Sequence, residues 1–432
     1  MVFWIFSNLL SKTVANRIIM KNKQKTIPKG WTRYTLGDKV EFLRGFGLSK
    51  DKIVEGGINK CILYGELYTK YNEVVGEVQS RTNSFEGTKS KKGDVILPSS
   101  TTTKGIDLAN AVAINEDNIL LGGDIIIIRD KSNIFNSNYF AHYLTHILKK
   151  DIEKLTQGTT IIHLYGNSLK NLEVTLPPLK EQQKIAEILS VVDEDIEKTD
   201  EIIKKTEELK KGLMEELFTK GIGHKKFKNT ELGAVPEEWK VEELKNVSTK
   251  IGDGLHGTPE YSDGSEFYFI NGNNIFEREI KIYSETKRIS VEEYQFHKKE
   301  LTNRSVLLSI NGTIGNIGFY NGEKVVLGKS VAYINCDIKI NKEFIAYQLE
   351  TERIQKYFTR ELTGTTIKNL SLGTIRRTLI FVPSDKEQRK IKSILLEVDN
   401  KIQINKKLKN KLTELKKGLM RDLLSGKKYE FI

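Results

Sequence analysis

The sequence has few of the residues that build disulfide and metal sites. Its two cysteines, Cys61 and Cys336, lie far apart with no CxxC motif, which excludes a disulfide framework and a structural zinc site. The six histidines show no metal-ligand spacing, so no metal ion is expected. No 18 apolar residues follow one another, which excludes a transmembrane helix. Together these absences predict a cytoplasmic chain with no membrane contact.

Signatures of catalysis are also missing. The one Pro-Pro pair, Pro177-Pro178, lies between leucines, where no polar side chain could hold the amino group that a methyltransferase modifies. Gly322–Ser330 resembles a phosphate-binding P-loop, but five residues separate its glycines where four are needed. We therefore expect no catalytic residue in this chain.

The composition is that of a folded protein with several domains. The 432 residues suggest two to four domains, and 38% hydrophobic residues are enough for real cores. The net charge of +12 weakly favours a polyanionic partner such as nucleic acid. Residues 1–20 begin with a short apolar run that lacks the basic segment and cleavage site of a signal peptide. They are expected to be a leader of doubtful relevance, with Met20 as an alternative start.

The chain is a tandem duplication. Glu181–Leu189 recurs as Glu387–Leu395, and Leu209–Leu217 recurs as Leu415–Leu423, both at an offset of 206 residues. The same offset relates Gly158-Thr159-Thr160 to Gly364-Thr365-Thr366, and the front of each half carries a Pro-x-x-Trp motif, Pro28–Trp31 and Pro236–Trp239. Several marks in the same order exclude coincidence.

The repeated segments 181–217 and 387–423 are predicted to be long helices. In the first, apolar or Thr residues fall at 185, 189, 192, 196, 199, 202, 206, 209, 213 and 217, and the second follows the same pattern with one exception, Asn405. Spacings of three and four predict a coiled-coil seam. The first segment carries a net charge of −6 and the second +6, which favours pairing of one with the other. The opposing view, that these charges are only solvated, stays open.

Between the repeats the halves diverge. Short β-branched and aromatic runs separated by Gly, Asn and Asp predict twisted strands, and each variable region ends in a helical stretch, 138–155 and 341–362. The fold class is therefore α+β: two mixed α/β domains joined by two long helices that form an antiparallel coiled coil, in a pseudo-two-fold tandem duplication.

The order of variable region, GTT turn, proline and EQxKIAxIL helix ending in LKKGLM, given twice, resembles the specificity (S) subunit of type I restriction-modification systems. The strings YGELYTKY and GDVILPSS resemble one class of target recognition domain, and DGLHGTPEY and LLSINGTIG resemble another. The resemblance implies target recognition domains at 21–180 and 236–386, a central repeated helix at 181–217, a linker at 218–235 and a C-terminal repeated helix at 387–425. It also implies a non-catalytic subunit that recognises a bipartite, asymmetric DNA target.

The resemblance implies partners too. These are double-stranded DNA, two methyltransferase (M) subunits and restriction/translocase (R) subunits. S-adenosylmethionine, ATP and Mg²⁺ would belong to the partner subunits, and this chain would hold no cofactor. A stand-alone or orphan DNA-binding protein without a restriction partner is the main alternative, and a coiled-coil protein that binds no nucleic acid is a third.

Sequence readout requires amide, hydroxyl and guanidinium groups on loops next to strand ends. Asn-Gly is also a common turn pair, and a run of hydroxyls can be a solvated loop, so each candidate also has a structural reading. The predicted DNA contacts are Arg44, Ser99, Ser100, Thr101, Thr102, Thr103, Lys104, Thr159 and Thr160 in the first half, and His256, Thr258, Asn271, Asn273, Asn274, Ser309, Asn311, Thr313, Thr365, Thr366 and Lys368 in the second.

Charge is unevenly distributed. Residues 1–30 carry +6 and the linker 218–228 carries +4, whereas the two variable regions are close to neutral, at +2 and −1. DNA-binding regions with so little net charge should depend on partner subunits for much of their affinity for phosphates.

Overall fold

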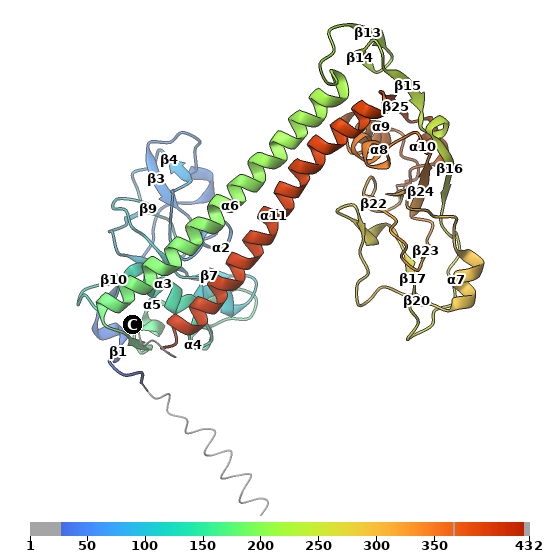
Figure 1. Ribbon diagram of the computed structural model, residues 1–432. Coiled ribbons are helices and arrows are strands. Elements are labelled where there is room, and N and C mark those ends of the chain that lie inside the picture. The colour runs from blue at the N-terminus through green and yellow to red at the C-terminus, as the bar shows by residue number, and fades with distance from the viewer. Residues whose placement is uncertain (1–26, 366–367, 427–432) are drawn as a thin grey trace, which may run out of the picture. The chain divides into compact units, whose positions relative to one another are not determined.

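The computed structural model describes residues 27–365 and 368–426 (Figure 1). The expected leader, residues 1–20, and Thr366 lie outside these ranges. The chain divides into two compact units, the first comprising the residues up to Thr199 with those from Leu408 onward, and the second Asp200–Lys407. Each of the two long helices, α6 (Leu179–Thr219) and α11 (Asp385–Leu423), contributes one part to each unit.

The first unit contains two four-stranded sheets with the orders β2-β10-β6-β8 and β4-β3-β9-β5. Every pair in the first sheet is antiparallel, and β3 and β9 are parallel in the second. The elements are β1 (Thr32–Thr35), β2 (Val40–Arg44), β3 (Asn59–Ile62), α2 (Glu66–Thr69), β4 (Ser80–Thr82), β5 (Thr88–Lys89), β6 (Val95–Pro98), β7 (Ser100–Thr101), β8 (Val112–Ala113), β9 (Leu120–Leu121), β10 (Ile125–Asp130), α3 (Ser137–His146), α4 (Lys149–Glu153), β11 (Ile162–His163), α5 (Gly166–Leu169) and β12 (Glu173–Leu176).

The second unit contains sheets with the orders β16-β24-β21-β22 and β20-β17-β23, and in the latter β17 and β23 are parallel. Its elements are β13 (Phe227–Thr230), β14 (Gly233–Pro236), β15 (Lys240–Glu243), β16 (Ser248–Asp253), β17 (Phe267–Ile270), β18 (Ile275–Phe276), β19 (Glu279–Ile280), β20 (Arg288–Ile289), α7 (Val291–His297), β21 (Ser305–Ser309), β22 (Ile317–Phe319), β23 (Val325–Leu327), β24 (Val331–Cys336), α8 (Lys342–Leu349), α9 (Glu352–Arg360), α10 (Leu372–Arg377) and β25 (Leu379–Val382).

The two units share one topology although their variable sequences differ. The order β2-β10-β6-β8 matches β16-β24-β21-β22, the parallel pair β3–β9 matches β17–β23, and β1–β12 matches β15–β25. The duplication therefore extends through the sheets, and the divergence lies in side chains and loops.

The burial of strand β10 on both of its faces explains why its sequence is a run of isoleucines. Ile126 and Ile128 lie in one core cluster with Phe140 of α3, whereas Ile125 and Ile127 lie in another. Because successive side chains point to opposite faces, a strand buried on both faces needs apolar residues at every position.

The long helices pack against each other in antiparallel fashion within each unit. In the first unit Ile185 and Leu189, near the start of α6, share a core with Leu423 at the end of α11. In the second unit Met214, near the end of α6, shares a core with Ile391, near the start of α11. The predicted antiparallel coiled coil is confirmed.

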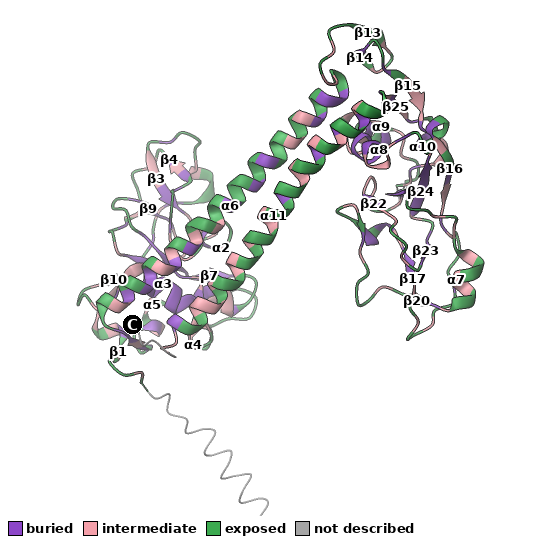
Figure 2. Ribbon diagram, viewed as in Figure 1, coloured by how far each residue is buried: buried purple, intermediate pink, exposed green. Residues whose placement is uncertain are grey.

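In α6 the buried seam of the coiled coil differs from the predicted apolar positions after residue 199. Ile202 and Leu209 were expected in the seam but are exposed, and Ile203 is buried instead. The step from Thr199 to the next buried seam residue, Ile203, is four residues, whereas the predicted stripe stepped three residues from 199 to 202, so the stripe is wrong at this point. Figure 2 shows α6 and α11 exposed over most of their surface, with buried residues at intervals along α6.

Two further expectations about helices need correction. The stretch 138–155 is two helices, α3 and α4, and the stretch 341–362 is also two, α8 and α9. Thr351 separates the second pair because its backbone is extended, with φ −62° and ψ 145°, and it caps α9. Its hydroxyl donates to the carbonyl of Gln348.

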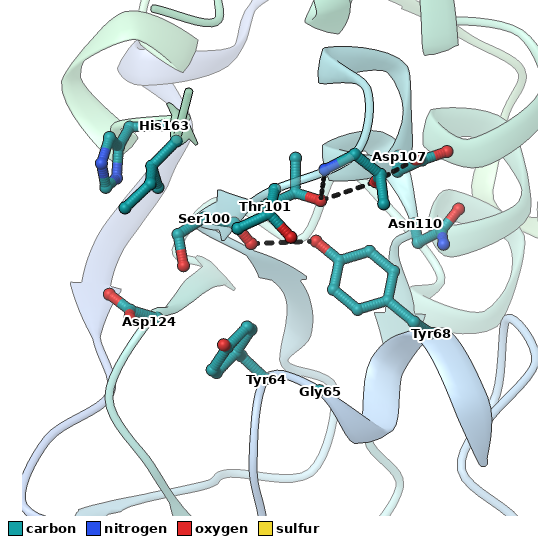
Figure 3. A pocket seen from close by; sticks show the side chains of 12 residues that line it. Tyr64, Gly65, Tyr68, Ser100, Thr101, Asp107, Asn110, Asp124 and His163 are labelled. Carbon is teal, nitrogen blue, oxygen red and sulfur yellow. Dashed lines mark hydrogen bonds between the residues drawn. The ribbon is translucent and has the colours of Figure 1, made fainter. Parts of the chain in front are cut away.

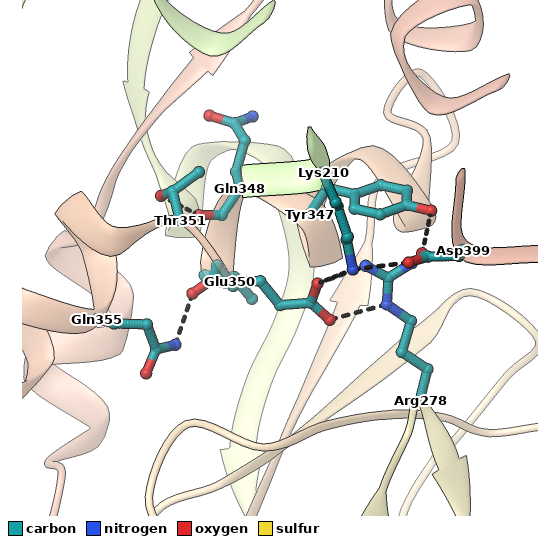
Figure 4. A network of polar contacts seen from close by, with 9 residues as sticks. Lys210, Arg278, Tyr347, Gln348, Glu350, Thr351, Gln355 and Asp399 are labelled. Carbon is teal, nitrogen blue, oxygen red and sulfur yellow. Dashed lines mark hydrogen bonds and ion pairs between the residues drawn. The ribbon is translucent and has the colours of Figure 1, made fainter. Parts of the chain in front are cut away.

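A polar network ties the coiled coil to the sheet domain in the second unit (Figure 4). Lys210 of α6 lies 2.7 Å from Asp399 of α11, and Arg278 pairs with both Asp399 and Glu350. The Arg278 guanidinium stacks on the ring of Tyr347, whose hydroxyl donates to Asp399 at 2.6 Å. Although burial disfavours its charge, these carboxylates raise the pKa of Arg278 above its ordinary value.

Candidate nucleic-acid interface

In the first unit, strand pairing brings two predicted contact loops together. Strand β7, Ser100–Thr101, pairs with β11, which follows the turn containing Thr159 and Thr160. The loop that leads from Ser99 to Lys104 therefore lies beside the GTT turn. A pocket of about 730 Å³ opens here (Figure 3), lined by Tyr64, Gly65, Tyr68, Ser100, Thr101, Thr102, Thr103, Asp107, Asn110, Asp124, Ile161 and His163.

The loop from Ser99 to Lys104, the hydroxyl loop, is held in place by hydrogen bonds among its own residues and to its neighbours. The Thr101 and Thr103 hydroxyl oxygens are 2.8 Å apart, and the Thr103 hydroxyl donates to Asp107 at 2.6 Å. The Tyr68 hydroxyl donates to the backbone carbonyl of Ser100 at 3.1 Å. Burial raises the pKa of Tyr68, so that its phenol stays protonated and remains a donor. Ser99, Ser100 and Thr101 are buried, while Thr102, Thr103 and Lys104 are exposed.

Arg44 lies at the end of β2 with an exposed side chain. Its guanidinium is 3.3 Å from Asp124, which also lines the pocket, so Arg44 lies at the rim. Asp107 and Asp124 add two carboxylates to this pocket. Carboxylates repel phosphates but accept hydrogen bonds from the amino groups of bases, which suits this pocket to base readout.

Sequence reasoning missed the aromatic and acidic residues of this pocket. Tyr64 and Tyr68 come from YGELYTKY, a string that resembles one class of target recognition domain but from which no contact residue was predicted. Asp124 lies in the string GGDIIII, which resembles the same class of target recognition domain, whereas Asp107 gave no signal because its position beside the hydroxyl loop depends on tertiary contacts.

In the second unit the residues on either side of the GTT sequence, Thr363 and Asn369, occupy the equivalent place. Thr363 forms a bridge with Asn369, and Asn369 forms a bridge with Asn311, one of the predicted contacts. Gln157 and His163 form the same bridge in the first unit, at an offset of 206. Thr365, Lys368 and Thr313 are exposed near this junction of loops.

Three predicted contacts of the second unit hold loops together. Asn274 is 4% exposed, and its amide group donates to Lys281 and Thr286. Ser309 is fully buried, and its hydroxyl accepts from the Asn316 N–H. The Asn271 carboxamide oxygen accepts from the Ser330 hydroxyl at 2.9 Å. Burial therefore leaves Asn274 and Ser309 out of reach of a duplex.

The remaining predicted contacts are on the surface. Asn273 and Thr258 are exposed, and so is His256, whose imidazole is 2.7 Å from the Asp253 carboxylate. His256 lies beside the chain near Gly328, because Leu255 bridges to Gly328. In the first unit Thr159 and Thr160 are likewise exposed.

The expectation that the histidines lack metal-ligand spacing is wrong. His142 and His146 are four residues apart on α3, and with Glu73 they place three ligand atoms within 4.8 Å of one another. Residues i and i+4 share one face of a helix, so the spacing itself was the available signal.

Among the helices of the described residues, none is long and apolar enough to cross a membrane.

Comparison with known proteins gives consistent results. The family model described as Type I restriction modification DNA specificity domain matches residues 28–208 and again residues 236–414. The chain is 28% identical over 421 residues to the type I restriction enzyme MjaVIII specificity subunit of Methanocaldococcus jannaschii, covering 93% of each protein. It is 27% identical to the putative MjaX specificity subunit of the same organism, over 72% of each.

A solved structure shows the same fold. The type I restriction-modification system S subunit from M. genitalium superposes with a TM-score of 0.60 at 18% identity, covering 93% of this chain and 98% of the other.

Proposed function

The chain belongs to the type I restriction-modification DNA specificity family, and we propose that each of its two units reads one half of a split, asymmetric DNA target. As a member of that family it is a non-catalytic subunit that supplies sequence specificity. The observation that carries the proposal is the repeated topology with divergent loops. A common framework positions two different sets of polar side chains, as a target with two different halves requires.

The proposed contacts are the exposed members of the predicted set together with Asn311, which is half-buried. Thr159, Thr160 and Thr365 lie on turns common to both units and are suited to phosphates, because a shared feature cannot distinguish two sequences. Within the proposed domains 21–180 and 236–386, the side chains assigned to bases or to the adjoining backbone are Arg44, Thr102, Thr103, Lys104, His256, Thr258, Asn273, Asn311, Thr313 and Lys368.

The assembly contains methyltransferase and restriction subunits in this proposal, with one methyltransferase docked per half. Support comes from apolar residues that the coiled coil leaves exposed at equivalent positions. Ile202 and Leu408 are 43% and 44% exposed, and Leu209 and Leu415 are 55% and 50% exposed. Members of each pair are 206 residues apart, and each helix presents its two residues one heptad apart on one face. Two copies of one apolar surface suit two copies of one partner.

Catalysis and its cofactors belong to the partners in this proposal. S-adenosylmethionine would serve the methyltransferase subunits, and ATP and Mg²⁺ the restriction subunits. The cytoplasm is the proposed location, because the DNA target would be there.

Single-molecule sequencing of host DNA, with and without this gene, tests the proposal. Loss of adenine methylation at one split, asymmetric motif is expected in the deletion. Unchanged methylation, together with tight binding of the isolated chain to a split site, would instead favour the stand-alone DNA-binding protein.

Native mass spectrometry of the chain co-expressed with its methyltransferase tests the stoichiometry. Two copies are expected with the wild type, one with either Leu209→Asp or Leu415→Asp, and none with both. Lys204→Ala, an exposed change on the side of α6 that faces away from Ile202 and Leu209, is the control and should keep two copies. A strictly one-to-one complex of the wild type would contradict the symmetric docking.

A further inference from the structure

The first unit contains a buried histidine whose polar atoms are not satisfied. His142 of α3 is 1% exposed, and neither of its ring nitrogens has a hydrogen-bond partner within the described ranges. Its Nδ1 lies 3.6 Å from Oε2 of Glu73 and therefore faces that carboxylate. A buried polar atom without a partner costs about 1–3 kcal/mol, so the site as it stands is incomplete.

His146 completes a possible set of three ligands with His142 and Glu73, and Lys416 orients the Glu73 carboxylate. Nε2 of His146, one helical turn further along α3, lies 2.6 Å from Oε1 of Glu73. Lys416 of α11 holds Oε2 of Glu73 at 3.0 Å and Oδ1 of Asp193 at 2.7 Å, which fixes the position of the carboxylate. Two imidazoles and one oriented carboxylate thus converge, with His146 partly exposed on the solvent side.

The second unit shows what occupies the equivalent place there. The pair Lys210–Asp399 corresponds to Lys416–Asp193 at an offset of 206, and both are 2.7 Å long. The backbone carbonyl of Arg278 accepts from the N–H of Phe319 on β22, as the carbonyl of Glu73 accepts from Ala113 on β8. Arg278 and Glu73 therefore occupy the same position in the shared topology.

The charges of the two networks differ by one cation. In the second unit Arg278 and Lys210 balance Glu350 and Asp399. In the first unit Glu73 and Asp193 face Lys416 alone, which leaves one net negative charge if both histidines are neutral. A neutral imidazole has a nitrogen lone pair that it can donate to a metal ion.

We propose that Glu73, His142 and His146 bind one divalent transition-metal ion of the zinc class, which ties the loop of Glu73 to α3 at the base of the coiled coil. Two imidazole nitrogens and a carboxylate oxygen are ligands that Zn²⁺ and Co²⁺ accept. The ion supplies the cation that Arg278 supplies in the second unit, and it satisfies His142. The role is structural and is independent of the proposed function.

Zinc binding to the purified full-length chain tests the proposal directly. The chain should carry no histidine tag, be stripped with EDTA and be titrated calorimetrically with ZnCl₂. One equivalent should bind, and the melting temperature should rise with the logarithm of free Zn²⁺. Co²⁺ should give the visible absorption bands of a protein-bound cobalt ion.

His146→Ala is the informative variant, because His146 is partly exposed and its loss should leave the fold intact. Zn²⁺ binding should weaken more than about 100-fold, since loss of an outer-shell partner alone costs about 10- to 100-fold. His297→Ala is the matched control: His297 also lies four residues from a glutamate, Glu293, and its loss should change nothing. Absence of binding by the wild type at about 10 µM Zn²⁺, a concentration at which structural sites are filled, would overturn the proposal. Equal binding by His146→Ala would overturn it as well.

Discussion

Gln182 and Gln388 occupy the same place in the two units. Each lies just inside the start of a long helix, and its carboxamide accepts from the N–H of the residue that caps a helix, Asn136 or Asn341. Each also donates to the carbonyl of the proline before the long helix. These amides join the coiled coil to the sheet domains, which explains why the EQ motif occurs twice.

Replacing Gln388 by Ala should lower the free energy of unfolding. The N–H of half-buried Asn341 and the carbonyl of buried Pro383 would lose their partners, and the unpaired buried carbonyl alone costs about 1–3 kcal/mol. Urea unfolding followed by circular dichroism measures the loss. Gln183→Ala, an exposed neighbour of Gln182, is the control and should change stability by less than about 0.5 kcal/mol. Equal stability of the two variants would contradict this role.

Lys104 tests the proposed interface. Lys104→Ala should weaken binding to every duplex to a similar degree and reduce the salt dependence by about one ion, because a lysine on a phosphate releases about one counterion. Fluorescence anisotropy across a salt series measures both quantities. Lys205→Ala on α6 should leave the slope unchanged, and a slope unaffected by Lys104→Ala would remove this loop from the interface.

The two long helices show that hydrophobic periodicity predicts the bounds of a helix but not every residue of its buried face. The repeated sequence predicts helices at 181–217 and 387–423, and the structure has them at 179–219 and 385–423. Periodicity does not choose between Ile202 and Ile203, because both are apolar and both fit a spacing of three or four. The partner helix makes that choice.

Adjacent isoleucines allow a matched test of the seam. Ile203 is 8% exposed and Ile202 is 43% exposed. Ile203→Ala should destabilise the chain by about 2 kcal/mol or more through the loss of buried apolar volume. Ile202→Ala should cost much less while weakening the docking of the methyltransferase. Thermal or urea unfolding of both variants decides, and the reverse order of stability would restore the predicted seam.

At the scale of the whole molecule, the shared topology predicts that the sheet domains can be exchanged. A chain with residues 28–178 in place of residues 236–384 would carry the same reader twice. Its methylation target should become symmetric, two copies of one half-site with a spacer, because both units would present the same loops. Sequencing of methylated host DNA reveals the motif. An unchanged asymmetric motif would contradict the assignment of one half-site to each unit.

The sequence by itself determined the duplication, the long helices, the α+β class and the family, because repeats and heptads are local patterns that survive without knowledge of contacts. It also indicated the hydroxyl loop and the GTT turns. Only the tertiary structure decided that Asn274 and Ser309 are buried, that Tyr68 and Asp107 join the hydroxyl loop, and that Glu73 meets His142. These outcomes depend on residues far apart in the chain, whose approach is set by strand pairing and packing.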